Sequence, residues 1–372
     1  MKSIGWKTWL VAAFVVALLS LVFVSIRANK PADARAISRQ WAASGHADRK
    51  AEAFVYWDEA DPAAVPKNCA KCHSVYGFMD FLGEDGSASG AVDAEARVGS
   101  VLFCTACHNE TAYDLTSVRF ASGSVVEGLG REAVCMQCHQ GTQSGVGVDK
   151  VLAGKGEDVV DPKQGFVNVH YHMAAATQMG AEARVAYQYP GQAYVERFPH
   201  TKNLDTCIAC HDPHSLQIDP KRCSPCHANV VTAEDVEKIR AVTDTVDYDG
   251  DANVKEPMSG EVAGMHDRLY RAIQDYAIAV CGRPIVYSAD AYPYFFLDTN
   301  SDGKTDPAEA QAGNRFNAFT PRLLKATFNY QFVEKDPGSS AHNAKYILQI
   351  LYDSMRDLSA KVPVDMQGLV RP

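Results

Sequence analysis

The sequence has no excess of basic residues and almost no cysteine that stands alone. It holds 36 Lys and Arg against 45 Asp and Glu, a formal net charge of −9 at pH 7, so it lacks the electrostatic footprint of a nucleic-acid-binding protein. Of 11 cysteines only Cys281 lies outside a CxxC pair, which argues against a disulfide framework and favours a small buried hydrophobe at this position. No stretch is polar enough to predict disorder, and 372 residues suffice for two ordinary domains or one large one.

The first thirty residues carry a long apolar segment. Lys2 and Lys7 precede a nearly unbroken run from Trp9 to Ile26, which as a helix would span roughly 27 Å, close to the hydrocarbon thickness of a bilayer. The run is longer than the apolar core of a typical signal peptide, and the small-x-small sequence at 32–34 follows two basic residues, a poor context for cleavage. We therefore predict an uncleaved signal anchor, a transmembrane helix within 1–30, over the alternative of a cleaved export signal.

Five CxxCH motifs carry the chemistry of the chain. Two thiols three positions apart on one turn can reach the two vinyl groups of one porphyrin, and the adjacent histidine then sits over the iron. Zinc ribbons also pair CxxC sequences, but they do not require a histidine at the same place in every copy. The sequence therefore predicts five covalently bound haem c groups. Their attachment residues are Cys69, Cys72, Cys104, Cys107, Cys135, Cys138, Cys207, Cys210, Cys223 and Cys226, and their proximal iron ligands are His73, His108, His139, His211 and His227.

The sixth position of each iron decides between an electron carrier and an enzyme, because substrate chemistry needs a vacant position. Seven histidines lie outside the motifs. His214 follows His211 by three residues, and since axial ligands lie on opposite faces of one porphyrin, we expect His214 to reach a neighbouring haem. His170 and His172 are two apart, so only one is expected to face a given iron, whereas His266 lies in a helical stretch and is expected to be an ordinary surface histidine. Methionine is the alternative distal ligand, with Met79, Met173 and Met179 as candidates.

Residues 41–230 resemble the large multihaem cytochrome c family, with its repeated CxxCH and CxxCHxxH patterns. The strings SGHAD, GFVNVHY, FPH before CIACHDPH, and DPGSSAHN are similar to distal-ligand segments of such proteins. The resemblance implies that the five distal ligands are His46, His170, His200, His214 and His342. Every iron would then have two histidine ligands and a low potential, as expected of an electron carrier rather than an enzyme. No motif has lysine in place of the proximal histidine, a departure from the pentahaem nitrite reductases that argues against a reductase site.

After His227 the pattern changes to helical periodicity. Thr232, with Asp235 three residues later, is expected to cap a helix that continues through Val242. Apolar residues at helical spacing predict three further helices, which run from Ser259 to Val280, from Thr320–Pro321 through Leu324, Phe328 and Phe332, and from Asn343 to Leu358. We interpret these stripes as core packing.

Residues 298–309 fit the twelve-residue EF-hand loop, with oxygen donors on alternate positions, a glycine for the turn and a closing glutamate. The expected ligands are Asp298, Asn300, Asp302, Lys304 through its carbonyl, Asp306 and Glu309. A weaker copy offers Asp247, Asp249, Asp251 and Asn253, closed by Glu256 or Glu261, but has Ala252 at the glycine position. We therefore expect one or two Ca²⁺ ions in a pair of loops between helices; the alternative is a solvated acidic turn.

The predicted fold class is mainly α with much irregular structure. It consists of a transmembrane helix at 1–30, a pentahaem cytochrome c domain at 38–230 held together by its haems, and a helical EF-hand-like calcium-binding domain at 231–372 that sends His342 back to one iron. The predicted function is electron transfer in an anaerobic or respiratory chain, on the periplasmic side of a bacterial or archaeal cytoplasmic membrane, with a cleaved and secreted form as the alternative.

The expected partners are redox proteins: a quinol-linked complex, other cytochromes or a terminal reductase. Nucleic acid is not expected. Two alternative functions stay open, a membrane-anchored quinol dehydrogenase and a multihaem reductase of nitrogen or sulfur oxyanions. A vacant iron position would favour the reductase, and oxidation of a quinol by the protein alone would favour the dehydrogenase.

Overall fold

The computed structural model describes residues 33–201 and 203–372. Short helices precede residue 230 in this part of the chain: α2 (Ala34–Ala42), α3 (Glu52–Val55), α4 (Lys67–His73), α5 (Val75–Leu82), α6 (Glu110–Asp114), α7 (Ala133–Met136), α8 (Gly145–Leu152), α9 (Ala174–Met179) and α10 (Cys207–Cys210). Three longer helices follow: α11 (Met258–Ala279), α12 (Pro321–Glu334) and α13 (Ser339–Leu358). The described strands form antiparallel two-stranded ribbons: β1 (Ala64–Val65) with β2 (Ala96–Arg97), β3 (Val118–Arg119) with β4 (Val125–Val126), and β5 (Ile285–Tyr287) with β6 (Phe295–Leu297).

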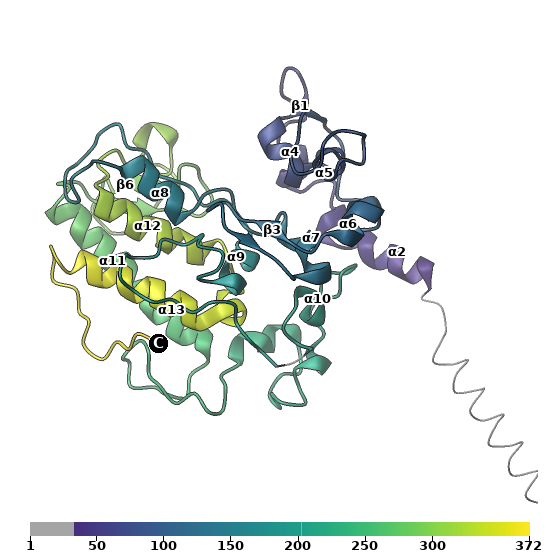
Figure 1. Cartoon of the computed structure of the whole chain (residues 1–372). Coiled ribbons are helices and arrows are strands. Elements are labelled where there is room, and N and C mark those ends of the chain that lie inside the picture. The colour runs from purple at the N-terminus through teal and green to yellow at the C-terminus, as the bar shows by residue number, and fades with distance from the viewer. Residues whose placement is uncertain (1–32, 202) are drawn as a thin grey trace, which may run out of the picture.

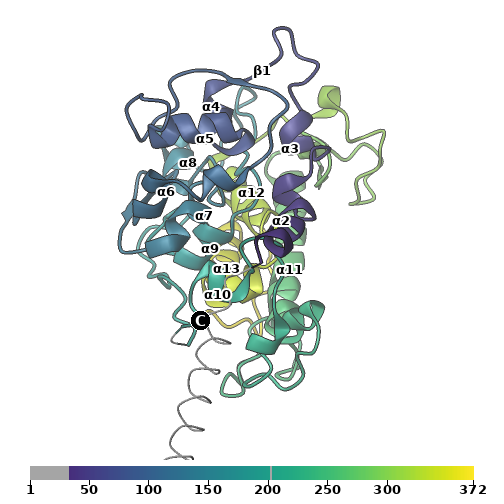
Figure 2. The same cartoon turned by 90° about the vertical axis from the view of Figure 1, so that its right-hand side faces the viewer.

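The CxxCH motifs and the long helices occupy different parts of the molecule. Figure 1 shows α4 and α5 at one end and α11, α12 and α13 at the other, with α7 and α9 between them. In Figure 2, seen at 90°, α4, α7 and α10 follow one another down the molecule, in the same vertical order as in Figure 1. The helices that carry motifs therefore lie in succession beside the helical core.

The main core combines the long helices with the segment 118–189. Every side chain of α12 from Pro321 to Val333 is buried, because α11, α13 and the earlier segment surround this helix. The stripes predicted on α12 and α13 are confirmed, since Phe328 and Leu351, for example, are 0% exposed. Tyr187 belongs to the same buried cluster, so the core joins residues on both sides of position 230.

Two predicted helix starts are confirmed by their caps. The Thr320 hydroxyl accepts from the N–H of Leu323 at 3.2 Å, and Pro321 occupies the first turn of α12. α13 has a kink at Asn343, where the backbone is not helical. The Asn343 carboxamide oxygen accepts from the N–H of Tyr346 at 3.2 Å, so it caps the longer part of the helix at the predicted position. The short turn before the kink carries His342.

The helix predicted after Thr232 is wrong beyond Lys238. The capping box at Thr232 forms, but it begins a short 3₁₀ helix, Ala233–Lys238. The chain then extends, and the Arg240 side chain donates to Glu261 at 2.5 Å, while Val242 is 91% exposed. The contact of Arg240 with the fully buried Glu261 carboxylate outweighs a weak apolar stripe, because a buried carboxylate without a partner would be costly.

The predicted fold class needs one correction. Within residues 33–201 and 203–372, no helix is long and apolar enough to cross a membrane. The long helices carry charged residues such as Arg268 and Arg271 on α11 and Lys345 and Arg356 on α13. The described fold is mainly helical with irregular segments, and a transmembrane helix is not part of it. The segment 1–30, for which that helix was predicted, lies outside the described residues.

Candidate functional site

Each CxxCH motif forms a backbone turn of the same kind. In the second to fifth motifs the histidine N–H donates to the carbonyl of the first cysteine at 2.8–3.1 Å, and the first motif lies in the last turn of α4. This bond between residues four apart holds both thiols and the imidazole of a motif on a single turn. Attachment of two thiols to one porphyrin, with the adjacent histidine on its iron, requires such a turn.

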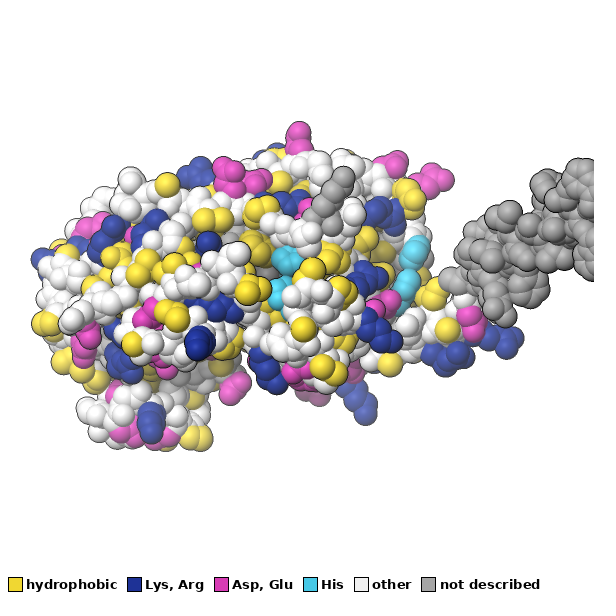
Figure 3. Space-filling view, turned by 90° about the horizontal axis from the view of Figure 1, so that it is seen from below, with side chains coloured by type: hydrophobic (Ala, Val, Ile, Leu, Met, Phe, Trp, Pro, Cys, Tyr) yellow, Lys and Arg dark blue, Asp and Glu magenta, His cyan; other side chains and the backbone are white. Residues whose placement is uncertain are grey.

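The motif side chains do not belong to the buried interior. All ten motif cysteines are half-buried or exposed, although free cysteine is among the most buried residue types. His108, His172 and His200 are exposed, and Figure 3 shows imidazole side chains at the surface, in the middle of this face and toward its right-hand side. Thiols and imidazoles are thus arranged where a flat apolar cofactor would cover them.

Motifs far apart in the sequence lie in contact. The Cys138 thiol of the third motif lies 3.8 Å from the carbonyl oxygen of Lys71 in the first. Glu132, buried just before the third motif, accepts from the N–H of Cys207 in the fourth at 3.1 Å. Arg222, just before the fifth motif, donates to a main-chain oxygen of the fourth at 2.6 Å. The first, third, fourth and fifth motifs therefore form one continuous line.

The second motif branches from this line. Ala106, inside the motif, belongs to a small apolar cluster with Val134 and the half-buried Cys138 of the third motif. Asn109, directly after the motif, lies 3.9 Å from the sulfur of Met79 on α5. The second motif therefore contacts the elements of both the first and the third.

The methionines considered as alternative iron ligands pack elsewhere. Met173 and Met179 are 0% exposed and belong to the main core, and Met79 packs in the small cluster beside the second motif. These thioethers serve packing, so the structure favours histidine as the distal ligand.

Imidazole rings lie near the motif histidines at the spacing that two ligands of one metal ion would have. An imidazole nitrogen binds a metal at about 2 Å, so two imidazoles on opposite sides of one iron would have ring centres about 6 Å apart. The ring centres of His73 and His170 are 5.8 Å apart. Those of His108 and His214 are 6.1 Å apart, with ring planes within 3° of parallel. These donor pairs fit a haem iron between them.

The third motif histidine has two such neighbours. The ring centre of His139 lies 6.2 Å from that of His46 and 5.6 Å from that of His172. Burial, and then the charges of the surrounding imidazoles, among them those of His172 and His46, lower the pKa of His139 to about 4. The third motif is therefore the most crowded of the five, with one more candidate ligand than it needs.

His172 was missing from the predicted ligand set. His170 and His172 both have left-handed backbone, with φ of 77° and 58°, a conformation that costs a non-glycine residue about 1–3 kcal/mol. In an extended strand the two side chains would point to the same side. The left-handed turns instead direct His170 to His73 and His172 to His139. The H-x-H spacing was visible in the sequence, but the backbone conformation that separates the two rings was not.

Several of these imidazoles are held through Nδ1. Nδ1 of His73 lies 2.8 Å from the carbonyl oxygen of Ala53, and the same atoms of His200 and His211 lie 3.0 and 3.2 Å from main-chain oxygens. Metal-bound histidines normally donate their other ring N–H in this way, which fixes the tautomer and the ring orientation. The contacts leave Nε2 as the atom that could bind iron.

His342 is held by a carboxylate instead. Its Nδ1 lies 2.9 and 3.0 Å from the two side-chain oxygens of Asp336, and Asp336 is 2% exposed. Burial by itself would raise the pKa of Asp336, but the charge and hydrogen bond of His342 outweigh it and lower that pKa. Asp336 in turn raises the pKa of His342 against the effect of burial.

The expectation that His266 is a surface histidine is wrong. His266 is 8% exposed, and its ring stacks on Tyr330 with 4.1 Å between ring centres. Its Nε2 lies 3.0 Å from the Tyr330 carbonyl oxygen and its Nδ1 3.5 Å from Glu334. This face of α11 packs on α12, a contact that one helix's periodicity does not reveal. Both ring nitrogens are engaged, so His266 is not a ligand candidate.

Cys281 behaves as expected of a cysteine that packs. It is half-buried against the main core, and burial raises the pKa of its thiol to about 12. A thiol with so high a pKa is a poor nucleophile at neutral pH.

The 298–309 segment forms a loop, but not between helices. The strand β6 leads into it, and a short 3₁₀ helix, Ala312–Asn314, follows it. The expected helix–loop–helix arrangement is therefore wrong here, because Phe295 and Phe296 are buried and pair with β5 instead of continuing a helix. The aromatic residues before the loop are compatible with a buried strand as well as with a helix. Only their packing against β5 shows that they form a strand.

Within this loop two of the predicted ligands turn inward. The carboxylate of Asp298 accepts from the N–H groups of Ser301 at 2.6 Å and Gly303 at 2.9 Å. Glu309, 1% exposed, accepts from the N–H of Thr299 at 2.6 Å. The remaining predicted oxygen donors, Asn300, Asp302, Lys304 and Asp306, are half-buried or exposed.

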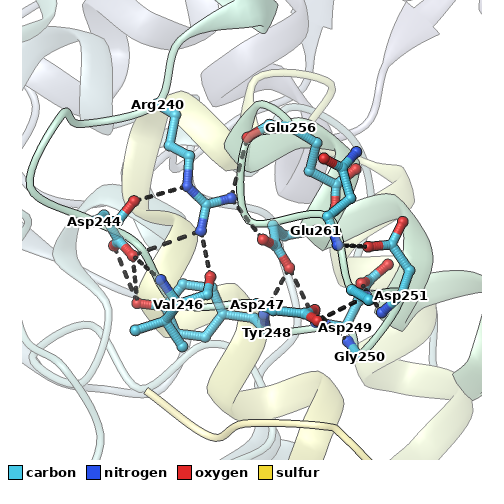
Figure 4. Close-up of polar contacts among 12 residues, drawn as sticks. Arg240, Asp244, Val246, Asp247, Tyr248, Asp249, Gly250, Asp251, Glu256 and Glu261 are labelled. Carbon is cyan, nitrogen blue, oxygen red and sulfur yellow. Dashed lines mark hydrogen bonds and ion pairs between the residues drawn. The ribbon is translucent and has the colours of Figure 1, made fainter.

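The weaker copy brings its carboxylates together. Oxygens of Asp247, Asp249 and Glu261 lie within 4.8 Å of one another, and so do those of Asp249, Asp251 and Glu256. Figure 4 shows these side chains converging from the 247–251 loop and from the start of α11. Both glutamates considered as the closing ligand thus contribute, and Asp249 is shared by the two groups. Asn253 is exposed and donates its N–H to Asp251.

Three features of this cluster suit a cation. Among the described residues, Oε1 of Glu256 is buried without a hydrogen-bond partner. Burial, and then the charges of the neighbouring carboxylates, raise the pKa of Glu256 to about 7. A side chain at Gly260 or Gly264 would overlap the carboxylate of Glu256 or Asp249. The carboxylates are therefore packed closely, and a divalent ion would relieve their repulsion.

Comparison with known proteins agrees with the motifs. The chain is 24% identical over 353 residues to the C-type polyheme cytochrome OmcB of Geobacter sulfurreducens, covering 80% of this chain and 44% of OmcB. It is also 24% identical over 363 residues to the C-type polyheme cytochrome OmcC of the same organism, covering 84% of this chain and 45% of OmcC. No family model and no solved structure matches the chain. The chain spans less than half the length of these relatives, and the similarity supports a multihaem c-type cytochrome.

Proposed function

We propose that this chain carries electrons along five haem c groups, each attached to one CxxCH motif and each with a histidine on both sides of its iron. The observation that carries the proposal is the pair His108 and His214, whose parallel rings lie 6.1 Å apart. An iron with two histidine ligands has no open position for a substrate, which favours electron transfer over catalysis. The chain's own contribution is to hold the ligands in place and to set the local charge.

The proposed ligand pairs combine the facing rings with the residues implied by the resemblance. They are His73 with His170, His108 with His214, His139 with His46, and His211 and His227 with His200 and His342. His172 is the alternative to His46 at the third motif. The Nδ1 contacts of His200, His211 and His342 support their use as ligands through Nε2.

The contacts between motifs support a continuous path. Electrons would pass along the line of the first, third, fourth and fifth motifs, with the second as a branch at the third. The proposed partners are other redox proteins on the extracytoplasmic side, namely a quinol-linked complex, other cytochromes or a terminal reductase. The net charge of −9 favours partners with a basic docking surface, because opposite charges steer association.

Calcium is a second part of the proposal. We assign one Ca²⁺ to the carboxylates around Asp249 and one to the 298–309 loop, with Asp298 and Glu309 as its inward ligands. In an exported protein such ions are structural. Both sites lie within the helical part, 231–372, which the ions would stabilise.

Spectroscopy of the iron tests the function directly. The haem-to-protein ratio of the full chain should be five, and electron paramagnetic resonance of the oxidised protein should show only low-spin haems with two histidine ligands. A stoichiometric high-spin signal would mean a vacant iron position and would contradict the carrier in favour of a reductase.

A further inference from the structure

Asp336 is the only carboxylate found against Nδ1 of a proposed iron ligand at hydrogen-bond distance in residues 33–201 and 203–372. Its two oxygens lie 2.9 and 3.0 Å from Nδ1 of His342. The corresponding contacts of His73, His200 and His211 are to neutral carbonyl oxygens at 2.8–3.2 Å. A hydrogen bond to an ionised acceptor is about twice as strong as one to a neutral acceptor. His342 is therefore held more strongly than these three imidazoles.

The turn between α12 and α13 builds this contact. The N–H of Asp336 donates to the carbonyl of Val333 at 3.1 Å, and the N–H of His342 donates to that of Gly338 at 2.9 Å. A Cβ at Gly338 would lie 2.7 Å from Cε1 of the His342 ring. The ring therefore needs glycine at this position to rest against the turn and reach the carboxylate.

The carboxylate is also buried. Asp336 is 2% exposed, whereas the His342 side chain keeps 26% of its surface. Burial limits the screening of the negative charge by water, so the charge acts on the imidazole at close range. With Nδ1 engaged by Asp336, Nε2 is the ring nitrogen left to meet a cofactor.

The turn lies beside the crowded third motif. The N–H of Met173, next to His172, donates to the carbonyl of Lys335 at 3.3 Å, and the N–H of Ala175 donates to the carbonyl of His139 at 2.8 Å. The first turn of α9 thus connects the Asp336 turn to the third motif through main-chain hydrogen bonds.

We propose that Asp336 is a positioning residue that directs Nε2 of His342 to its iron and lowers the reduction potential of that haem. The inference rests on the proposed function, in which His342 is a distal ligand. Reduction adds one electron to ferric iron, and the Nδ1 proton stays between the imidazole and the carboxylate. The negative charge favours the ferric state because this state is more positive by one unit, and hydrogen bonding at the outer ring nitrogen makes the ligand a stronger donor.

The test is Asp336→Asn in the full haem-loaded chain, followed by a redox titration read by electron paramagnetic resonance. We expect one haem to become easier to reduce by about tenfold, equal to 59 mV for a one-electron couple, with all haems still low-spin. Asp336→Glu keeps the negative charge, so its haem potentials should stay close to those of the native chain. The matched control is Asp353→Asn, because Asp353 is equally buried on α13 but pairs with Arg371 and Tyr194; it should move no potential.

The outcomes separate this inference from the proposed function. If His342→Ala changes one haem from low-spin to high-spin but Asp336→Asn moves no reduction potential, Asp336 has no such role. The assignment of His342 as a ligand then stands. If His342→Ala leaves every haem unchanged, the assignment of His342 and the inference both fail. Should Asp336→Asn not fold, Gly338→Ala keeps the carboxylate and displaces the ring; one potential should then rise, and unchanged potentials would overturn the inference.

Discussion

The rings of His108 and His214 lie 6.1 Å apart, measured between their centres, with ring planes within 3° of parallel. His214 follows the fourth motif by three residues, yet it lies opposite the histidine of the second. This arrangement links two motifs that the chain places far apart, and it makes the ligand assignment testable one pair at a time.

Replacing His214 by alanine should remove one axial ligand. We expect one of the five haems to change from low-spin to high-spin, a loss of about one fifth of the low-spin intensity in the oxidised spectrum. The matched control is His266→Gln, because both ring nitrogens of His266 contact protein groups. An unchanged spectrum for His214→Ala would remove His214 from the ligand set.

The third motif allows a direct choice between two ligands. Because His46 is the proposed partner of His139, His46→Ala should produce one high-spin haem and His172→Ala should produce none. The comparison uses the same low-temperature spectra at equal haem content. The reverse result would make His172 the ligand and His46 the spare, while a change in neither variant would mean that each ring can replace the other.

The N-terminal motif region should depend on its haems more than the helical core does. The apolar clusters around the first motif are small, for example Val65, Ala70, Val92 and Ala96, whereas the core of α11, α12 and α13 is large. In Cys69→Ser/Cys72→Ser we expect protease cleavage within 52–100 and none within 258–358. Limited proteolysis with mass spectrometry measures this. Cys223→Ser/Cys226→Ser is the matched control and should leave 52–100 protected; cleavage of the long helices in the first variant would contradict the prediction.

Calcium should bind at two places that single substitutions separate. Titration calorimetry with calcium chloride should find two sites in the chelator-treated full chain, and one each in Asp249→Asn and Asp298→Asn. At a hundredfold excess over its dissociation constant, each ion should stabilise the fold by about 2.7 kcal/mol. Lys304→Ala is a fitting control, because only its carbonyl is a predicted ligand. Binding that is unchanged in both carboxylate variants would show that neither cluster is a calcium site.

Asp158 should make stability depend on pH at acid values. Partial burial raises its pKa, but hydrogen bonds from Arg322, Tyr276 and Lys361 outweigh this effect and lower the pKa to about 2. Since the ordinary value is about 3.9, the stabilisation is complete above about pH 5 and is lost as the pH falls through 4 toward 2. Asp158→Asn should therefore lower the free energy of unfolding at pH 7 by about 1–3 kcal/mol.

Denaturant unfolding at pH 7, 5 and 3 measures this dependence. The difference in unfolding free energy between the native chain and Asp158→Asn should be equal at pH 7 and 5 and smaller at pH 3. Asp161→Asn is the control, because Asp161 pairs with Lys155 at the surface and solvent weakens such pairs. A difference that is constant down to pH 3 would contradict the lowered pKa.

Some structural elements were predictable because their causes are local. The buried residues Leu324, Phe328 and Phe332 could be predicted from their helical spacing alone. The Thr320 cap could be predicted because a hydroxyl side chain stands directly before the first turn of a helix, where N–H groups are free. Other elements depended on distant residues. Arg240 ends a predicted helix because it pairs with Glu261, and the segment before Asp298 is a strand because it pairs with β5.

The sequence by itself determined the cofactor chemistry. Two cysteines and a histidine on one turn are a local pattern, so ten attachment cysteines and five proximal histidines could be predicted without any structure. The sequence also showed how many histidines outside the motifs are available as distal ligands. The tertiary structure alone decided which imidazole faces which motif, because those distances depend on how distant segments pack. The left-handed backbone of His170 and of His172 directs their rings to different motif histidines, and the fold places the buried Asp336 against His342. Contacts between distant segments and unusual backbone conformations depend on how the whole chain packs, so a local sequence pattern does not predict them.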